Sequence, residues 1–114
     1  MSRRDDQRLG DVLAAAAAIA NHITRGGLDD GLVFDAVRVR LIEIGEAVKA
    51  IDPDLLAREP AISWIDVAGM RKHLAHRYFD TAHAIVQATV TEDLPPLVAA
   101  AKRLLDHLTV DPRS

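Results

Sequence analysis

The spacing of aliphatic residues is the feature that most constrains how this chain can fold. Apolar positions recur every three or four residues along most of the sequence, which is the period of an amphipathic α-helix. The first stripe comprises Leu9, Val12, Leu13, Ala16, Ile19, Ala20 and Ile23, and the second comprises Val33, Val37, Leu41, Ile44, Val48 and Ile51. Aromatic residues are only 4% of the chain, so the core must be aliphatic. The sequence therefore predicts an all-α protein.

Glycine and proline residues predict where these helices end. Gly26 and Gly27 follow the first stripe, and Pro53 ends the second helix because the residue before a proline disfavours helical backbone. A short extra turn is expected around Leu55 and Leu56. The remaining stripes predict helices from 64, from 82 to 90 and from 94 to 108. We expect an antiparallel up-and-down bundle of four main helices plus the short extra one, in a single domain over residues 1–114.

Polar and proline signals refine the later boundaries. Ser63 is a candidate N-cap with Asp66 three residues on, close to a capping box, so a helix is expected to begin at about Trp64. The indole of Trp64 is expected to anchor the packing rather than to stack on a ligand. Residues 92–96 are expected to interrupt the helical pattern before the last helix.

The composition of the whole chain excludes several classes of protein. It has no cysteine, which excludes a disulfide framework and thiolate zinc sites and is compatible with the cytoplasm. A net charge of −3 argues against broad, nonspecific nucleic-acid binding, so any RNA contact must be local. The first residues carry the charge of a signal peptide, but Asp5 and Asp6 follow, so neither a signal peptide nor a membrane span is expected.

Val39 and Ile42 break the pattern of the second helix. At 100° per residue they fall among charged side chains on the face opposite the core stripe. Two β-branched residues within a polar face indicate a second contact, such as another subunit. The alternative is that both are isolated surface aliphatic residues, which are common in monomers.

Candidate chemistry is concentrated in residues 63–80, SWIDVAGMRKHLAHRYFD. Arg71, His76 and Tyr78 form an R-x4-H-x-Y pattern, which offers a permanent cation, a group that titrates near neutrality and a phenol. This set suits a phosphodiester, because arginine can hold a phosphate oxygen and a neutral histidine can accept a proton from a nearby hydroxyl. The scheme requires no metal and no other cofactor.

This motif, which begins within Gly69-Met70-Arg71, resembles the HEPN superfamily. The longer run resembles its HepT branch, the toxin half of MNT/HepT toxin–antitoxin pairs. The supporting matches are Ile44-Gly45-Glu46-Ala47, Pro60-x-Ile62-x-Trp64 and Asp93-Leu94-Pro95-x-Leu97. One position departs from the family pattern, since Lys72 stands where the residue after the motif arginine is often small and polar.

The resemblance implies a metal-independent endoribonuclease. His76 would be the general base for a ribose 2′-hydroxyl, whose oxygen attacks the adjacent phosphate, while Arg71 would stabilise the developing charge. Tyr78 would orient the phosphate or hydrogen-bond His76. Glu46, if it faces the same cleft, would bias the tautomer of the imidazole.

The spacing of the motif adds a geometric condition. Arg71 and His76 are five residues apart, about 140° around a straight helix, so they do not converge on one phosphate by themselves. Either the helix ends or bends near His76, or a second copy of the motif faces the first. The resemblance implies the second arrangement, with paired motifs lining a cleft at a homodimer interface.

Lys72, His73 and Arg77 flank the motif and form a local basic patch. The patch could contact the RNA backbone, or it could be an ordinary solvated helix face. His73, His76 and His83 do not predict a metal site, because no acidic or cysteine ligand stands at a matching spacing.

Tyr78 has a second predicted role, and it is the sole tyrosine of the chain. The resemblance implies that a cognate MNT antitoxin, which is a nucleotidyltransferase, transfers AMP to its hydroxyl. The added anionic group would occupy the phosphate site beside Arg71 and His76 and repel RNA.

Two other classes of function stay open. One is a noncatalytic helical module whose motif residues hold a dimer or bind the nucleotidyltransferase. The other is a nucleotide-binding accessory subunit in which Arg71 grips a triphosphate. Loss of RNA cleavage on replacing His76 would separate the enzyme from the module, whereas saturable nucleotide binding without cleavage would favour the accessory subunit.

Overall fold

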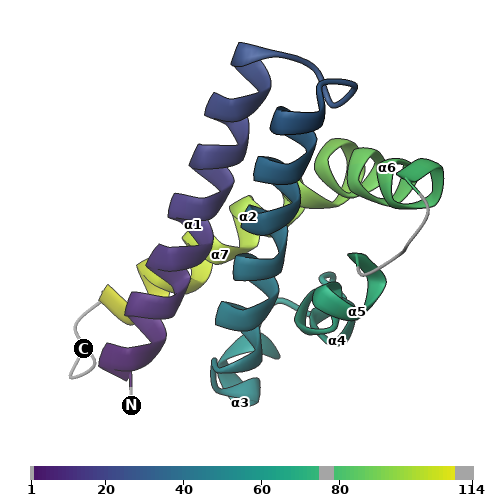
Figure 1. The fold of residues 1–114 in the computed structure, drawn as a ribbon. Coiled ribbons are helices and arrows are strands. Elements are labelled where there is room, and N and C mark those ends of the chain that lie inside the picture. The colour runs from purple at the N-terminus through teal and green to yellow at the C-terminus, as the bar shows by residue number, and fades with distance from the viewer. Residues whose placement is uncertain (1, 75–78, 110–114) are drawn as a thin grey trace.

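Two long antiparallel helices, α1 and α2, lie side by side in the structure (Figure 1). The structure, a computed structural model, describes residues 2–74 and 79–109. Helix α1 spans Ser2–Arg25 and ends at the predicted glycine pair, and α2 spans Gly31–Lys49. Asp30 caps α2, because its carboxylate accepts hydrogen bonds from the backbone N–H groups of Leu32 and Val33 at 2.8 and 3.3 Å.

The remaining elements flank this pair. They are α3 (Pro53–Leu56), α4 (Trp64–Ala68), α5 (Met70–Leu74), α6 (Phe79–Ala88), the π-helix η1 (Thr89–Asp93) and α7 (Leu94–Thr109). Helix α7 packs on α1, while α4, α5 and α6 contact α2. No strand occurs between residues 2 and 74 or between 79 and 109, so the prediction of an all-α bundle is confirmed. None of the helices in these ranges is long and apolar enough to cross a membrane.

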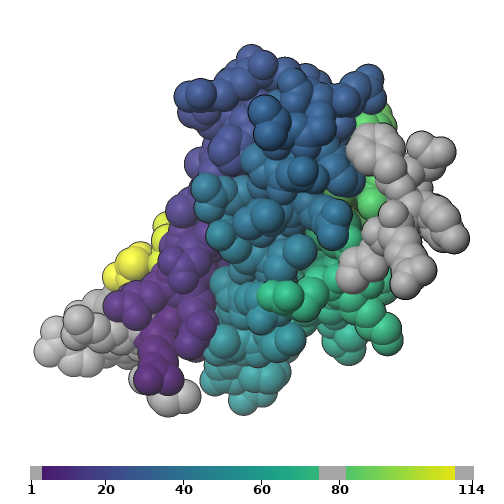
Figure 2. Space-filling model, viewed as in Figure 1, coloured from purple at the N-terminus to yellow at the C-terminus, as the bar shows by residue number. Residues whose placement is uncertain are grey.

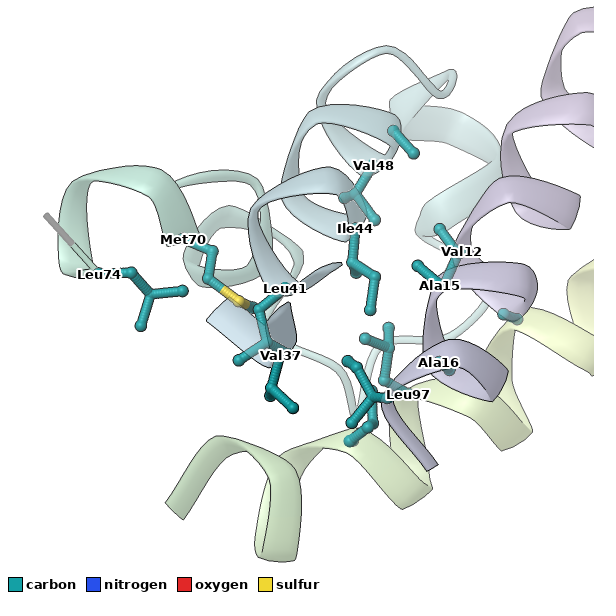
Figure 3. Packing of buried hydrophobic residues seen from close by; sticks show 14 of the residues in the cluster. Val12, Ala15, Ala16, Val37, Leu41, Ile44, Val48, Met70, Leu74 and Leu97 are labelled. Atoms are coloured by element: carbon teal, nitrogen blue, oxygen red, sulfur yellow. The ribbon is translucent and has the colours of Figure 1, made fainter. Parts of the chain in front are cut away.

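Helix α2 supplies the centre of the core. Val37, Leu41 and Ile44 are each 0% exposed, and burying one such side chain contributes about 2 kcal/mol. Figure 3 shows the residues that surround them: Val12, Ala15 and Ala16 from α1, Met70 and Leu74 from α5, and Leu97 from α7. The second predicted stripe is therefore buried between α1 on one side and α5 on the other.

Gly45 lets α4 and α5 approach α2 closely. A Cβ at this position would lie 2.7 Å from the carbonyl oxygen of Val67 and 3.2 Å from the Cβ of Met70. The first neighbour is backbone, which cannot rotate out of the way as the end of a side chain can. Any side chain at position 45 would therefore push the α4–α5 pair away from α2.

The helix predicted to begin at about Trp64 does begin there, but it is divided in two. Gly69 separates α4 from α5, and its carbonyl accepts a hydrogen bond from the N–H of Lys72, three residues on, at 3.0 Å. This is the tighter 3₁₀ pattern. The predicted capping box is wrong, because the hydroxyl of Ser63 donates to the carboxylate of Asp66 at 2.7 Å and accepts no hydrogen bond from the backbone N–H groups of the first turn.

The predicted interruption at residues 92–96 is also wrong. The chain runs from α6 through η1 directly into α7, and the N–H of Leu94 donates to the carbonyl of Thr89, five residues earlier. Pro95 and Pro96 account for the wide turn. They have no N–H, and in an α-helix their rings would clash with the carbonyls four residues before them. The prolines widen the helix here without ending it.

Trp64 anchors the connector between α3 and α4, as predicted. The indole packs against the core, and its Nε1 donates to the carbonyl of Glu59 at 3.0 Å. The carboxylate of Glu59 accepts from Arg103 of α7, with Nη2 2.7 Å from Oε1. This hydrogen bond holds the pKa of Glu59 below its ordinary value, although partial burial opposes the shift.

Replacing Gly45 with alanine is expected to lower the free energy of unfolding by about 1–3 kcal/mol, because the new Cβ displaces the carbonyl of Val67. Gly10→Ala in α1 is the matched control, since a Cβ there meets nothing within 4 Å. The better helix propensity of alanine is expected to raise the unfolding free energy of this control by up to about 1 kcal/mol. Urea denaturation followed by circular dichroism measures the free energy of unfolding of both variants. A stabilised Gly45→Ala protein would contradict the close approach.

Replacing Arg103 with methionine is expected to raise the pKa of Glu59 toward its ordinary value, measured by NMR titration of the carboxyl carbon. A lowered pKa in the folded state stabilises the fold above the unfolded pKa, and this contribution is lost as pH falls through the folded pKa. The stability difference between wild type and Arg103→Met should therefore shrink on acidification. Arg40→Met is the control, because Arg40 pairs with Glu43 instead. An unchanged pKa in Arg103→Met would contradict the assignment.

Candidate functional site

The structure describes one of the three motif residues, Arg71. Its exposed side chain extends from α5 toward α2, where its Nε lies 3.7 Å from Oε2 of Glu46. The same carboxylate oxygen lies 3.5 Å from Nζ of Lys49. The sequence predicted Glu46 as a supporting residue, and the structure brings it to the motif arginine. His76 and Tyr78 lie outside the described residues, so the convergence of the three motif residues stays a prediction.

Arg71 lines an open groove that lies along α1 and α2. The groove has a volume of about 950 Å³. The small side chains of Ala14, Ala15 and Ala18 form its α1 wall and leave it open. The α2 wall includes Val39 and Ile42. Figure 2 shows the face of the molecule on which α1 and α2 are exposed beside one another.

The charged side chains of this groove balance one another. Three arginines line it, Arg8, Arg40 and Arg71, together with three acids, Asp11, Glu43 and Glu46. Arg40 and Glu43 form an ion pair with Nη1 3.0 Å from Oε1. A groove of zero net charge is a poor track for an RNA backbone, which requires a surplus of positive charge. It is better suited to a surface with the same mixture of charges.

Val39 and Ile42 have different environments, although the sequence pattern predicted that both lie on the polar face of the helix. Val39 is 53% exposed, which agrees with its predicted place on the polar face. Ile42 is half-buried and packs against the hydrophobic core of its own chain. Contacts within one chain therefore explain the apolar side chain of Ile42. Val39 is the apolar residue of this face that they leave exposed.

The structure describes two members of the predicted basic patch, Lys72 and His73, both on α5. Arg71, Lys72 and His73 are all exposed, but successive helical residues point about 100° apart. His73 lines a separate pocket on the other side of α5, and its Nε2 lies close to Gly69. Arg77, the third predicted member of the patch, lies outside the described residues. Arg71 thus faces the groove without His73.

Arg8 and Arg40 are two arginines of the groove that the sequence did not predict as site residues. Each occupies a polar position of its own helix and matches no motif, so only the packing of α1 on α2 places them near Arg71. No local signal in the sequence could have identified them.

The chemistry available at Arg71 is recognition of an oxyanion. Its guanidinium offers donors in a fixed fork. The contact with Glu46 is long, and both side chains are exposed, so it contributes little stability and can be replaced by a phosphate. Glu46 therefore holds the guanidinium near the groove without blocking it.

Several known proteins are similar to this chain. "Putative RNase MJ0125" of Methanocaldococcus jannaschii is 34% identical over 95% of this chain and 97% of its own length. "Probable ribonuclease HepT" of Thermococcus cleftensis is 39% identical over 58% of this chain. "Putative RNase TTE0752" of Caldanaerobacter subterraneus is 35% identical over 59% of this chain. The matches span 61% of the length of the Thermococcus and Caldanaerobacter proteins.

The family described as "Ribonuclease HepT-like" matches residues 10–104, which is most of the chain. No solved structure is significantly similar to this chain. The match covers all the helices from α2 to α6 together with η1, most of α1 and most of α7, and it includes the R-x4-H-x-Y motif. The predicted family is confirmed. The chain belongs to the HepT-like ribonuclease family, within the HEPN superfamily that its motif resembled.

Proposed function

We propose that this protein is a toxin endoribonuclease that cleaves RNA by 2′-hydroxyl transesterification without a metal ion. The observation that carries the proposal is the position of Arg71, whose guanidinium lies beside Glu46 in an open groove. An exposed arginine held by a weak ion pair is available to bind a phosphate. Membership of a ribonuclease family supplies the class of substrate.

In the proposed reaction His76 takes the proton from a ribose 2′-hydroxyl. The 2′-oxygen attacks the adjacent phosphorus, the bond to the 5′-oxygen of the next nucleotide breaks, and a 2′,3′-cyclic phosphate and a 5′-hydroxyl end are formed. Arg71 stabilises the negative charge that develops on the phosphate oxygens. Tyr78 orients the phosphate, and Lys72 and Arg77 contact the RNA backbone.

We also propose that two copies form a homodimer through the groove. Arg71 and the exposed Val39 line the same groove, so a second chain that covers Val39 also brings its own motif toward Arg71. The equal numbers of arginines and acids allow the face to pair with itself across a two-fold axis.

The proposed partner that restrains the enzyme is an MNT-type nucleotidyltransferase antitoxin in the cytoplasm. It would transfer AMP to the hydroxyl of Tyr78, the sole tyrosine of the chain. The modification adds bulk and negative charge within eight residues of Arg71, so it would repel an RNA phosphate from the guanidinium.

Replacing His76 with alanine is expected to slow RNA cleavage at least about a hundredfold, because the general base is lost. Arg71→Ala should cause a loss of similar size by removing charge stabilisation. The measurement is cleavage of a mixed RNA substrate in EDTA, with mapping of the new ends. Wild type should produce cyclic phosphate ends that both variants lack.

His107→Ala controls for the substitution itself, since His107 is exposed on α7 and lines none of the concavities described above. It should cleave as fast as wild type. Equal cleavage by wild type and His76→Ala would point to contamination. A folded dimer that cleaves no RNA would favour the noncatalytic module, and saturable nucleotide binding by such a dimer would favour the accessory subunit.

Replacing Val39 with aspartate is expected to shift the protein from dimer to monomer and to abolish cleavage, because a charge is placed at the centre of the proposed interface. Light scattering after gel filtration measures the mass. Leu32→Asp is the matched control, since Leu32 is 83% exposed on the same helix but outside the groove. A Val39→Asp protein that remains dimeric would show that the copies meet elsewhere.

A further inference from the structure

A second concavity lies where α4 and α5 face α6, η1 and α7. It has a volume of about 280 Å³, at the small end of the range for ligand pockets. Its floor is apolar and comes from five helices, through Leu41, Val67, Met70, Ile85 and Leu97. Leu41, Met70 and Leu97 also belong to the buried core, so packing fixes the shape of the floor. The proposed ribonuclease reaction does not use this pocket.

The mouth of the pocket presents hydrogen-bond acceptors. The hydroxyl of Ser63 donates its hydrogen to Asp66 at 2.7 Å, and that of Thr89 donates to the carbonyl of Ile85 at 2.8 Å. Each hydroxyl proton is used within the protein, so the hydroxyls can only accept further hydrogen bonds. The carboxylates of Asp66 and Asp93 are acceptors as well, which leaves His73 as the lining side chain with an N–H to offer.

The charge of the mouth also favours a ligand that donates hydrogen bonds. No lysine or arginine is among the described residues that line the pocket, whereas the α1–α2 groove has three arginines. Among the side chains that the structure describes, no cation forms an ion pair with Asp66 or Asp93. The pocket therefore combines an apolar floor with a negative, acceptor-rich mouth. An anionic ligand such as a nucleotide would be repelled.

We propose that this pocket binds a small organic cation, a primary ammonium group attached to a short apolar body. The apolar body fills the floor, which has room for about one ring or a few methylene groups. The ammonium has three N–H donors and no acceptor, and it donates to the carboxylates of Asp66 and Asp93. The bound ligand connects α4, at the start of the motif segment, with η1.

Titration of the ¹⁵N-labelled full-length protein with phenethylammonium tests the proposal by NMR. Amide shifts are expected at residues 63–67 and 89–93. 2-Phenylethanol has the same apolar body without the charge, and 3-phenylpropionate has the opposite charge. Both should bind at least about tenfold more weakly, because neither makes the charge-assisted hydrogen bonds. Equal affinity for the alcohol, shifts confined to other regions, or no binding of the amine at millimolar concentration would overturn the proposal.

Asp93→Asn and Glu92→Gln form a matched pair of variants. Each removes one negative charge, at adjacent positions, but only Asp93 lines the pocket. Affinity for phenethylammonium should fall about tenfold in Asp93→Asn and stay unchanged in Glu92→Gln. Asp66→Asn is the second test if Asp93→Asn is unstable, and it should show the same loss. Equal effects at positions 92 and 93 would mean that overall charge, and not the pocket, attracts the amine, and would overturn the proposal.

Discussion

The structure depends on a backbone contact between α2 and α4. Gly45 has no side chain, and the carbonyl of Val67 occupies the space that a Cβ would need. This contact brings the next helix, α5, against α2, so Met70 and Leu74 reach the core. The same approach carries Arg71 to Glu46, one residue from Gly45. Packing and the position of the motif arginine thus have one steric cause.

Helix α5 separates two surfaces that differ in charge. On one side Arg71 enters a groove whose positive and negative side chains are balanced. On the other side His73 lines a pocket whose mouth carries the carboxylates of Asp66 and Asp93. A net charge of −3 averages over both and describes neither. Two surfaces that differ in charge can select different partners, although one five-residue helix contributes to both.

Local patterns in the sequence were enough to predict the all-α class, the C-terminal end of α1 and the turn at Leu55 and Leu56. These depend on periodicity and on glycine and proline, which act on the nearest turns of the chain. The prediction failed where two local effects compete. The hydroxyl of Ser63 bonds to a side chain where a backbone cap was expected, and the prolines at 95 and 96 are accommodated by a wider helix.

The candidate site was predicted in part, for a related reason. Arg71 and Glu46 were both identified, yet their contact depends on how closely α5 packs on α2, which no spacing in the sequence encodes. Arg8 and Arg40 carry no motif and come to the groove only through the α1–α2 packing. The burial of Ile42 likewise comes from neighbouring helices. Residues whose positions depend on tertiary contacts have no local sequence pattern that predicts those positions.

The wide turn at Thr89–Asp93 has a consequence for how this chain can change in length. A π-turn holds about one residue more than an α-turn, so it keeps the buried faces of α6 and α7 in phase. A residue could be lost at this turn with Val86 and Leu97 still directed at the core. Loss of a residue elsewhere in the run would rotate the following helix by about 100° and turn its apolar face toward water. The turn is thus the position in this run where evolution can most readily vary the length of the chain.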